Sequence, residues 1–170
     1  MRRSLPRADV ADVGGKLSDG GRQMEDWQSN LVRDDAGIRE IFQGAKRMAV
    51  LGIKTEAQEG QPAFFVPEYL QRAGYDIIPV PVYFPDVTTI LGKHVHRRVA
   101  DIPGGVELVV VFRRSQDVTS HVDDVLAAKP QAVWLQSGIA NDEAAERWAR
   151  AGIKVVQNRC SMVDHRRLMT

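Results

Sequence analysis

Apolar residues along the chain gather in short continuous runs that are separated by stretches of helical spacing. The runs that are expected to form strands cover residues 48–53, 75–80, 106–112, 131–135 and 153–156. Runs of this length, ended by glycine, proline or polar residues, are typical of strands buried in a sheet. The run at 106–112 is apolar throughout after Glu107, which predicts a central parallel strand. A further short edge strand is expected at His94 to Val99.

Between these runs, apolar residues recur at intervals of three and four positions, which predicts amphipathic helices. The first helix is expected to begin at Asp34 or Asp35, which are suitable N-cap residues, and its apolar stripe runs from Ile38 to Ala45. Further helices are expected over residues 116–128 and 141–152, with a short one within residues 158–168.

Prolines mark two of the element boundaries. If the second helix begins at Pro62, then Pro67 removes a backbone hydrogen bond from its interior and kinks it. If the helix begins near Val66, Pro67 takes the first helical position, where no such bond is needed. Pro79 and Pro81 are expected to end the strand at 75–80.

The alternation of strands and helices predicts an α/β fold with an open, doubly wound parallel sheet and helices on both faces. This is the three-layer, Rossmann-type arrangement. In such sheets, ligands bind beyond the carboxyl ends of the strands, where the winding reverses. The segments expected at that edge are Gly52–Thr55, Val80–Val82, Phe112–Ser115 and Gln136–Gly138.

A length of 170 residues, with 44% apolar and 26% charged residues, is typical of a single globular domain. Residues 1–33 show no clear period and are expected to form a flexible leader, whereas residues 34–170 are expected to form the domain. Within the leader, Met24, Trp27 and Leu31 have the alternative of docking on the domain as one helical turn.

Charge and hydropathy exclude several classes of protein. The formal net charge of +1 argues against a nucleic-acid binder that works through bulk charge. No stretch reaches the length of a transmembrane helix, and Arg2 and Arg3 are not followed by the apolar core of a secretory signal. The single cysteine, Cys160, has no internal disulfide partner. We therefore expect a soluble, cytoplasmic protein without a membrane or nucleic-acid partner.

Cations and hydroxyl groups are concentrated at the expected ligand edge. Lys54, Arg113 and Arg114 supply positive charge, and Thr55 and Ser115 supply hydroxyl groups. Fork-shaped donors and backbone amides at glycines suit phosphate. Two arginines at the start of a helix also oppose the helix dipole. This placement favours an anion site over a pair of ordinary surface charges.

The sequence contains no catalytic or metal-binding pattern that we recognise. Proline and valine follow the second strand, where a dinucleotide binder of the usual type has a carboxylate for the ribose. Neither G-x-S-x-G nor H-E-x-x-H occurs. His94 and His96 lack a third metal ligand. Cys160 and His165 are interpreted as a partly buried thiol and a surface histidine, rather than as a nucleophile and its base.

Several short motifs occur in a fixed order along the chain. They are Val50-Leu51-Gly52, Gly74-Tyr75, Ile78-Pro79-Val80, Ile90–Lys93, Asp101-Ile102-Pro103, Val110–Arg114, Ala132–Gly138, Gly152–Val156 and Asn158–Leu168. Together they resemble the small stand-alone CoA-binding proteins. The domain of those proteins is similar to the nucleotide-binding domain at the start of the succinyl-CoA synthetase alpha subunit. The resemblance extends over residues 38–168.

The resemblance implies a domain that holds coenzyme A or an acyl-CoA across the strand ends, with each segment of the ligand edge in a different role. It implies that the pyrophosphate would meet Gly52, Ile53, Lys54 and Thr55. The adenosine would be bordered by Val80 and Pro81. The other side would be lined by Phe112, Arg113, Arg114 and Val118, and the pantetheine would pass near Gln136 and Gly138.

The function implied by the resemblance is non-catalytic binding of coenzyme A by a carrier, sensor or regulatory partner. The chain ends where the first domain of the synthetase ends, so no ligase activity is expected. Two alternatives stay open. One is an enzyme that depends on NAD(P) or another nucleotide. The other is an interaction module with a vestigial pocket, because Pro81-Val82 stand where the family usually has Asn-Pro. A protein partner or a homo-oligomer is also left open.

Overall fold

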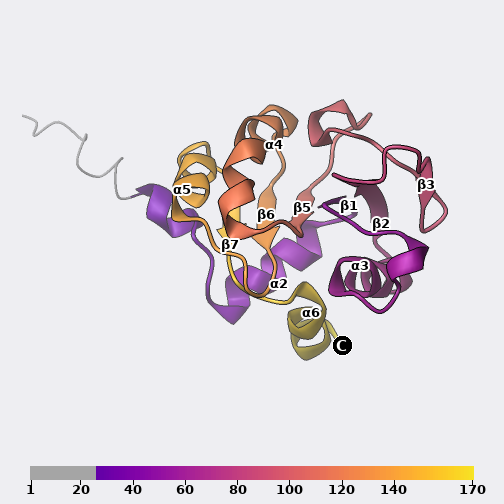
Figure 1. The fold of residues 1–170 in the computed structure, drawn as a ribbon. Coiled ribbons are helices and arrows are strands. Elements are labelled where there is room, and N and C mark those ends of the chain that lie inside the picture. The colour runs from indigo at the N-terminus through magenta and orange to yellow at the C-terminus, as the bar shows by residue number, and fades with distance from the viewer. Residues whose placement is uncertain (1–25) are drawn as a thin grey trace, which may run out of the picture.

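Five parallel strands form the middle layer of the structure, a computed structural model that describes residues 26–170 (Figure 1). They are β1 (Arg47–Leu51), β2 (Asp76–Val80), β5 (Leu108–Val111), β6 (Ala132–Leu135) and β7 (Lys154–Val156). Their order in the sheet is β2-β1-β5-β6-β7. The strand expected to be central, β5, is the middle one, and the predicted open, doubly wound sheet is confirmed.

Helices cover both faces of this sheet (Figure 1). On one side lie α2 (Asp35–Gly44), α3 (Pro62–Arg72) and α6 (Ser161–Met169), and on the other lie α4 (Val122–Ala128) and α5 (Asp142–Arg150). Side chains alternate along a strand, so Ala49 and Leu51 of β1 join the core beneath α4 and α5, whereas Met48 and Val50 join the core beneath α2 and α3. Because both faces are buried, the strand sequences are apolar apart from the charged first residues of β1, β2 and β7, which are only partly buried.

Side-chain caps fix the starts of two helices where the sequence predicts them. The Asp34 carboxylate accepts a hydrogen bond from the Gly37 N–H at 3.2 Å, at the start of α2. The Asn141 side chain accepts one from the Ala144 N–H at 3.0 Å, at the start of α5. Each cap satisfies an amide that has no partner within the helix itself.

One helix begins at the first of its two expected starts, and another differs from the expectation. α3 begins at Pro62, so that Pro67 lies in its interior, where it is buried. The helix expected over residues 116–128 is divided, because the 3₁₀ helix η4 (Ser115–His121) precedes α4. The Ser120 hydroxyl donates to the Asp117 carbonyl at 2.7 Å, and such local side-chain bonds favour a tighter turn over a regular α-helix.

The segment after β2 forms a small hairpin instead of the edge strand predicted at His94 to Val99. Its strands, β3 (Thr89–Ile90) and β4 (Lys93–His94), make a separate antiparallel sheet. Leu91 and Gly92 both have positive φ, at 53° and 72°, which is the geometry of a tight two-residue hairpin turn. The predicted strand is therefore wrong in extent. It begins at Lys93 and ends at His94, and the residues from Val99 to Asp101 form the 3₁₀ turn η3.

Both edge strands of the main sheet carry features that interrupt the row of unpaired backbone N–H and C=O groups on their outer side. Pro79 lies inside β2 instead of ending it, and its carbonyl accepts a hydrogen bond from the His96 N–H at 3.0 Å. A proline is tolerated there because β2 is an edge strand. On the opposite edge, Leu31 forms a parallel bridge with Val155 of β7, and the Val32 N–H donates to the Val155 carbonyl at 2.8 Å.

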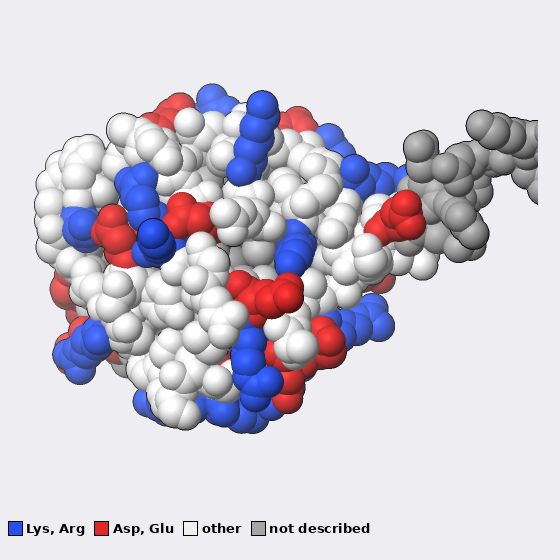
Figure 2. All heavy atoms as spheres, turned by 180° about the vertical axis from the view of Figure 1, so that it is seen from behind, with Lys and Arg blue, Asp and Glu red and all other residues white. Residues whose placement is uncertain are grey.

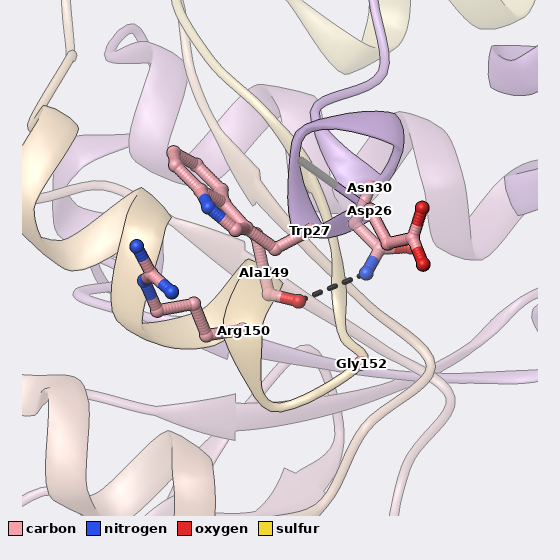
Figure 3. A pocket seen from close by; sticks show the side chains of 6 residues that line it. All are labelled: Asp26, Trp27, Asn30, Ala149, Arg150 and Gly152. Carbon is pink, nitrogen blue, oxygen red and sulfur yellow. Dashed lines mark hydrogen bonds between the residues drawn. The ribbon is translucent and has the colours of Figure 1, made fainter. Parts of the chain in front are cut away.

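Residues 26–33, which belong to the predicted leader, pack on the domain. Within them, η1 (Trp27–Asn30) lies against α5. The Asn30 side-chain amide donates to the Ala149 carbonyl at 2.8 Å, and the Arg150 guanidinium lies 4.9 Å from the centre of the Trp27 ring (Figure 3). Trp27 and Leu31 therefore dock on the domain, as the stated alternative predicted. Met24, with the rest of residues 1–25, lies outside the described residues.

Charged side chains of both signs are interspersed on the face shown in Figure 2. Several charged side chains of the domain are paired, as in Lys93 Nζ with Asp76 Oδ1 at 2.7 Å and Arg167 with Asp35 at 2.8 Å. None of the helices within residues 26–170 combines the length and the apolar character that crossing a membrane requires.

Candidate functional site

A pocket lies at the point where the winding of the sheet reverses. The chain passes from β1 outward to β2, then returns to the other side of β1 as β5 and continues to β6 and β7. The loops after β1 and β5 therefore diverge and leave a hollow of about 520 Å³ between them. It is lined by Gly52, Lys54, Gln61, Pro62, Ala63, Tyr83, Phe112, Arg113, Arg114, Gly138 and Ile139.

Gly52 allows the ends of β1 and β5, from which the two loops diverge, to approach each other closely. Its φ of +85° is in the left-handed region, and a Cβ placed there would lie 2.1 Å from the carbonyl oxygen of Phe112. Its N–H donates to the Val80 carbonyl at 2.9 Å, which joins the ends of β1 and β2. Only glycine combines this conformation with this contact, and the floor of the pocket is therefore bare backbone.

The loop after β1 is folded so that Lys54 faces the start of α3. The Thr55 hydroxyl accepts from the Ala57 N–H at 3.3 Å, and the Gln58 side chain accepts from the Thr55 N–H at 3.1 Å, which makes a capping box. The Lys54 N–H donates to the Ala63 carbonyl at 3.1 Å. The Lys54 ammonium group also donates to the side chain of Gln61, the N-cap residue of α3.

The start of α3 contributes to the same pocket through Gln61, Pro62 and Ala63. The N-terminus of a helix carries partial positive charge and amides without helical partners, so it favours anions. Lys54 adds a full positive charge beside it. This corner of the pocket therefore has the electrostatics that a phosphate group requires.

Arg113, at the end of β5, is held in place on the opposite side by three neighbours. Its side chain is only 13% exposed. Its Nε donates to His121 Nε2 at 3.2 Å, one terminal nitrogen donates to the Tyr83 hydroxyl at 3.3 Å, and the other lies 3.8 Å from the Asp117 carboxylate. These contacts fix the plane of a guanidinium group that lines the pocket.

Burial and the adjacent guanidinium both favour neutral His121. Burial, followed by the positive charge of Arg113, lowers the pKa of His121 below the usual histidine value. A neutral imidazole accepts through one nitrogen, which is the role that the Arg113 contact requires. By contrast, the Arg114 side chain is 73% exposed and is paired with Asp117 at 2.8 Å. The two arginines thus differ: Arg113 is fixed and Arg114 lies at the rim.

The pocket brings together about half of the residues named from the sequence. Those that line it are Gly52, Lys54, Phe112, Arg113, Arg114 and Gly138. Ile53, Val80 and Val118 lie instead in the apolar core, and Pro81 is buried at the end of β2. Position at a strand end does not reveal which way a side chain points, and alternate residues there turn into the core.

Thr55 and Gln136 are polar residues whose side chains serve the fold. The Thr55 hydroxyl caps the 3₁₀ helix η2 (Glu56–Gln58), and Thr55 lies outside the pocket lining. Gln136 is buried, with its amide nitrogen donating to the Ser161 hydroxyl at 2.7 Å and its oxygen accepting from the Ser161 N–H at 3.2 Å. Gln136 therefore connects the end of β6 to the start of α6.

Five lining residues were not identified from the sequence. They are Gln61, Pro62, Ala63, Tyr83 and Ile139. A helix starting at Pro62 would have indicated the first three, because a helix N-terminus beside a cationic loop is an anion site. Tyr83 lies in an irregular loop, and no spacing in the sequence connects it to Arg113, thirty residues further along the chain.

The remaining titratable candidates lie elsewhere. His165 is 7% exposed, so its interpretation as a surface histidine is wrong. Its Nδ1 is 2.8 Å from the Tyr69 hydroxyl, and the ring packs against Phe42 and Tyr75. Cys160 is partly buried, as expected. Within residues 26–170 no group of three or more His, Cys, Asp and Glu side chains is arranged to hold a metal ion.

A second, smaller hollow of about 280 Å³ lies beside Trp27, Arg150 and Gly152 (Figure 3). Gly152 precedes β7, so this hollow is at the amino end of that strand. Ligands of doubly wound sheets bind at the carboxyl ends. The pocket between the loops after β1 and β5 is therefore the candidate site.

Residues 46–166 match the family model of the CoA binding domain. The chain belongs to the CoA-binding domain family. The match includes every strand of the main sheet and all of the residues that line the pocket. The predicted relation to stand-alone CoA-binding proteins is thereby confirmed.

Three proteins of known sequence or structure are similar to most of this chain. YneT of Bacillus subtilis strain 168 is 32% identical over 130 residues, which are 76% of this chain and 93% of YneT. A Thermus thermophilus protein of known structure is 36% identical, with a TM-score of 0.73, and the match covers 80% of this chain and 99% of that one. A Pyrococcus horikoshii protein is 32% identical, also with a TM-score of 0.73, over 81% of this chain and 94% of its own.

The same fold occurs as one part of a larger enzyme. The dinucleotide-forming acetyl-coenzyme A synthetase 1 of Ca. Korarchaeum cryptofilum matches 65% of this CoA-binding domain protein and 25% of its own chain, with 21% identity and a TM-score of 0.55. At this identity the likeness extends to the fold alone. It is the architecture that the resemblance to synthetase domains implied.

Proposed function

We propose that the protein binds coenzyme A or an acyl-CoA in this pocket without catalysing a reaction on it. The observation that carries the proposal is the position of Arg113, which is nearly buried, fixed by three neighbours and directed to the pocket at the reversal point of the sheet. Burying a cation is costly unless it is paired, and Arg113 has only a distant carboxylate at 3.8 Å. A phosphate group would supply the missing charge.

The rest of the lining has the chemistry that such a ligand requires. Gly52 has no side chain, so a pyrophosphate could approach the backbone at this position. Lys54 and the start of α3 add positive potential to that of Arg113. Phe112, Ala63 and Ile139 add apolar surface for the less polar parts of the ligand. A volume of about 520 Å³ is within the range of small-molecule sites, which is about 300–1,000 Å³.

The composition of the lining supports a binding role. Of the described residues that line the pocket, none is a carboxylate, a histidine, a serine or a cysteine. General acid–base or nucleophilic chemistry on a thioester most often draws on one of these groups. The Lys54 ammonium and the Tyr83 phenol, which can also serve such chemistry, are bonded to Gln61 and Arg113. A carrier, a sensor or a regulatory partner of another protein needs only reversible binding.

Thermal-shift and calorimetric titrations test the ligand. Coenzyme A, acetyl-CoA, 3′-dephospho-CoA, NAD and ADP are compared at equal concentrations. Coenzyme A at one hundred times its dissociation constant should add about 2.7 kcal/mol to the free energy of unfolding. Arg113→Ala should abolish most of that gain. Arg72→Ala is the matched control, because the Arg72 side chain is 77% exposed at the far end of α3. A shift with NAD and none with coenzyme A would overturn the proposal.

A second measurement tests the absence of catalysis. Acetyl-CoA is incubated with the protein, and release of free thiol is followed, with a blank for the thiol of Cys160. The rate should equal that of spontaneous hydrolysis. Release that exceeds this rate and disappears in Arg113→Ala would show that the pocket is catalytic and would refute the proposal.

A further inference from the structure

Tyr83 is an exposed aromatic ring at the rim of the pocket. Of the large hydrophobic side chains in residues 26–170, only Tyr83, at 61%, and Val163, at 54%, are exposed. Val163 lies on α6, whereas Tyr83 lines the pocket. An exposed ring contributes little to the core, and this one lines a cationic pocket, where its free surface is available to a bound ligand.

The loop that carries Tyr83 is held by one side chain. The Arg97 guanidinium donates hydrogen bonds of 2.8–3.2 Å to four carbonyls of this loop. They are the carbonyls of Tyr83, Phe84, Pro85 and Val87. Phe84 adopts a left-handed backbone with φ of 63°, which is strained for a residue with a bulky side chain. Charged donors make strong bonds to carbonyls, and Arg97 thereby fixes an irregular loop. The Tyr83 ring is thus presented from a preorganised segment.

The ring is also placed next to the proposed phosphate group. Arg113 lies 5.5 Å from the centre of the Tyr83 ring and donates to its hydroxyl at 3.3 Å. This hydrogen bond, followed by the positive charge, lowers the pKa of the Tyr83 phenol. If a phosphate of the ligand binds Arg113, the part of the ligand next to that phosphate therefore lies within reach of the aromatic face of Tyr83.

We propose that the Tyr83 ring is the surface on which the purine of the bound nucleotide stacks, and that Arg97 is the residue that positions this ring. The inference rests on the proposed function and specifies its adenine contact. In coenzyme A the flat aromatic group is the adenine, which is connected through the ribose to the phosphates, whereas the pantetheine arm is flexible and has no π face. Stacking of a base on an aromatic side chain accounts for about 5- to 150-fold in affinity.

The test divides the ligand into its two halves. Calorimetry is used to measure the affinity of coenzyme A, of 3′-phosphoadenosine 5′-diphosphate and of 4′-phosphopantetheine for each variant. Tyr83→Ala should weaken the two adenine-containing ligands by about 5- to 150-fold and leave 4′-phosphopantetheine unchanged. Tyr83→Phe should retain most of the affinity, because the ring face remains. Val163→Ala, the other exposed apolar side chain, is the control and should have no effect.

Arg97 is tested as a positioning residue by the same comparison. Arg97→Met should weaken the binding of the adenine-containing ligands only. Arg97→Lys should give a smaller loss of affinity, because its ammonium group can still reach some, although fewer, of the four carbonyls. If wild-type protein binds coenzyme A and Tyr83→Ala binds it equally well, the stacking proposal is overturned and the proposed function stands. An equal loss of affinity for 4′-phosphopantetheine would also overturn the stacking proposal, since the ring would then contact the pantetheine arm. Failure of the wild type to bind coenzyme A would sink both proposals.

Discussion

Replacing Gly52 with alanine tests how the pocket floor is built. The added Cβ would lie 2.1 Å from the Phe112 carbonyl oxygen and 3.0 Å from the Phe112 carbonyl carbon. Both are backbone atoms, so no side-chain rotation relieves the contact. The chain must shift, although the loop is held by the bond from the Phe112 N–H to the Leu51 carbonyl at 2.8 Å and the bond from the Gly52 N–H to the Val80 carbonyl at 2.9 Å.

The magnitude follows from two separate costs. A left-handed backbone costs a residue with a Cβ about 1–2 kcal/mol. Overpacking that moves the backbone costs about 1–3 kcal/mol more. Gly52→Ala should therefore lower the free energy of unfolding by about 2–5 kcal/mol, which corresponds to a decrease in Tm of about 4–20 °C for a domain of this size.

Two other glycines provide the controls for a urea-unfolding series. Gly152 has the same φ of +85°, but a Cβ there meets nothing within 4 Å, so Gly152→Ala isolates the backbone cost. Gly60 has an ordinary φ and open space, so Gly60→Ala should be close to neutral. The entropy lost from the unfolded chain is common to all three variants. If Gly52→Ala and Gly152→Ala agree within about 0.5 kcal/mol, the close approach of the loops is not what requires glycine.

Three further outcomes are expected. Burial lowers the pKa of His165, so the native state binds fewer protons than the unfolded chain. The contribution of neutral His165 to the free energy of unfolding should therefore be fully present above about pH 6.5. It should fall below that pH, by at most about 1.4 kcal/mol per pH unit. His165→Gln should flatten this part of the pH–Tm curve. Gln136→Ala should cost about 1–3 kcal/mol, because it leaves Ser161 without its partners, and calorimetry should show unchanged coenzyme A affinity. In a spectrophotometric titration, Tyr83 should ionise below its usual pKa, and Arg113→Ala should return it to about 10.

The fold could be predicted from the sequence because its signals are local. Five apolar runs and the caps at Asp34 and Asn141 each depend on a few adjacent residues, and parallel pairing with right-handed crossovers leaves few arrangements. The division of the helix at Ser115–His121 was not predicted, because side-chain bonds within the segment override its apolar spacing. The hairpin was also missed, because Leu91 takes a positive φ that favours glycine or asparagine.

The site could be predicted only at the level of segments. The rule that ligands bind beyond strand ends selected loops that line the pocket, and with them the cations Lys54 and Arg113. It could not separate side chains that face the pocket from those that turn inward, as Val118 does, or from those that bond within the fold, as Gln136 does. Tyr83 was missed for a different reason. Its place depends on the side chain of Arg97, fourteen residues away.

The interrupted edges of the sheet restrict how this protein can associate with itself. β2 offers a proline and a carbonyl already bonded to His96, and β7 is covered where Leu31 and Val32 pair with Val155. Strand addition to the main sheet, a known route from a sheet to an aggregate, is therefore hindered at both edges. A chain cut back to residues 34–170 would keep α2 and its cap and lose the cover on β7. We expect it to aggregate at concentrations where the full chain stays in solution.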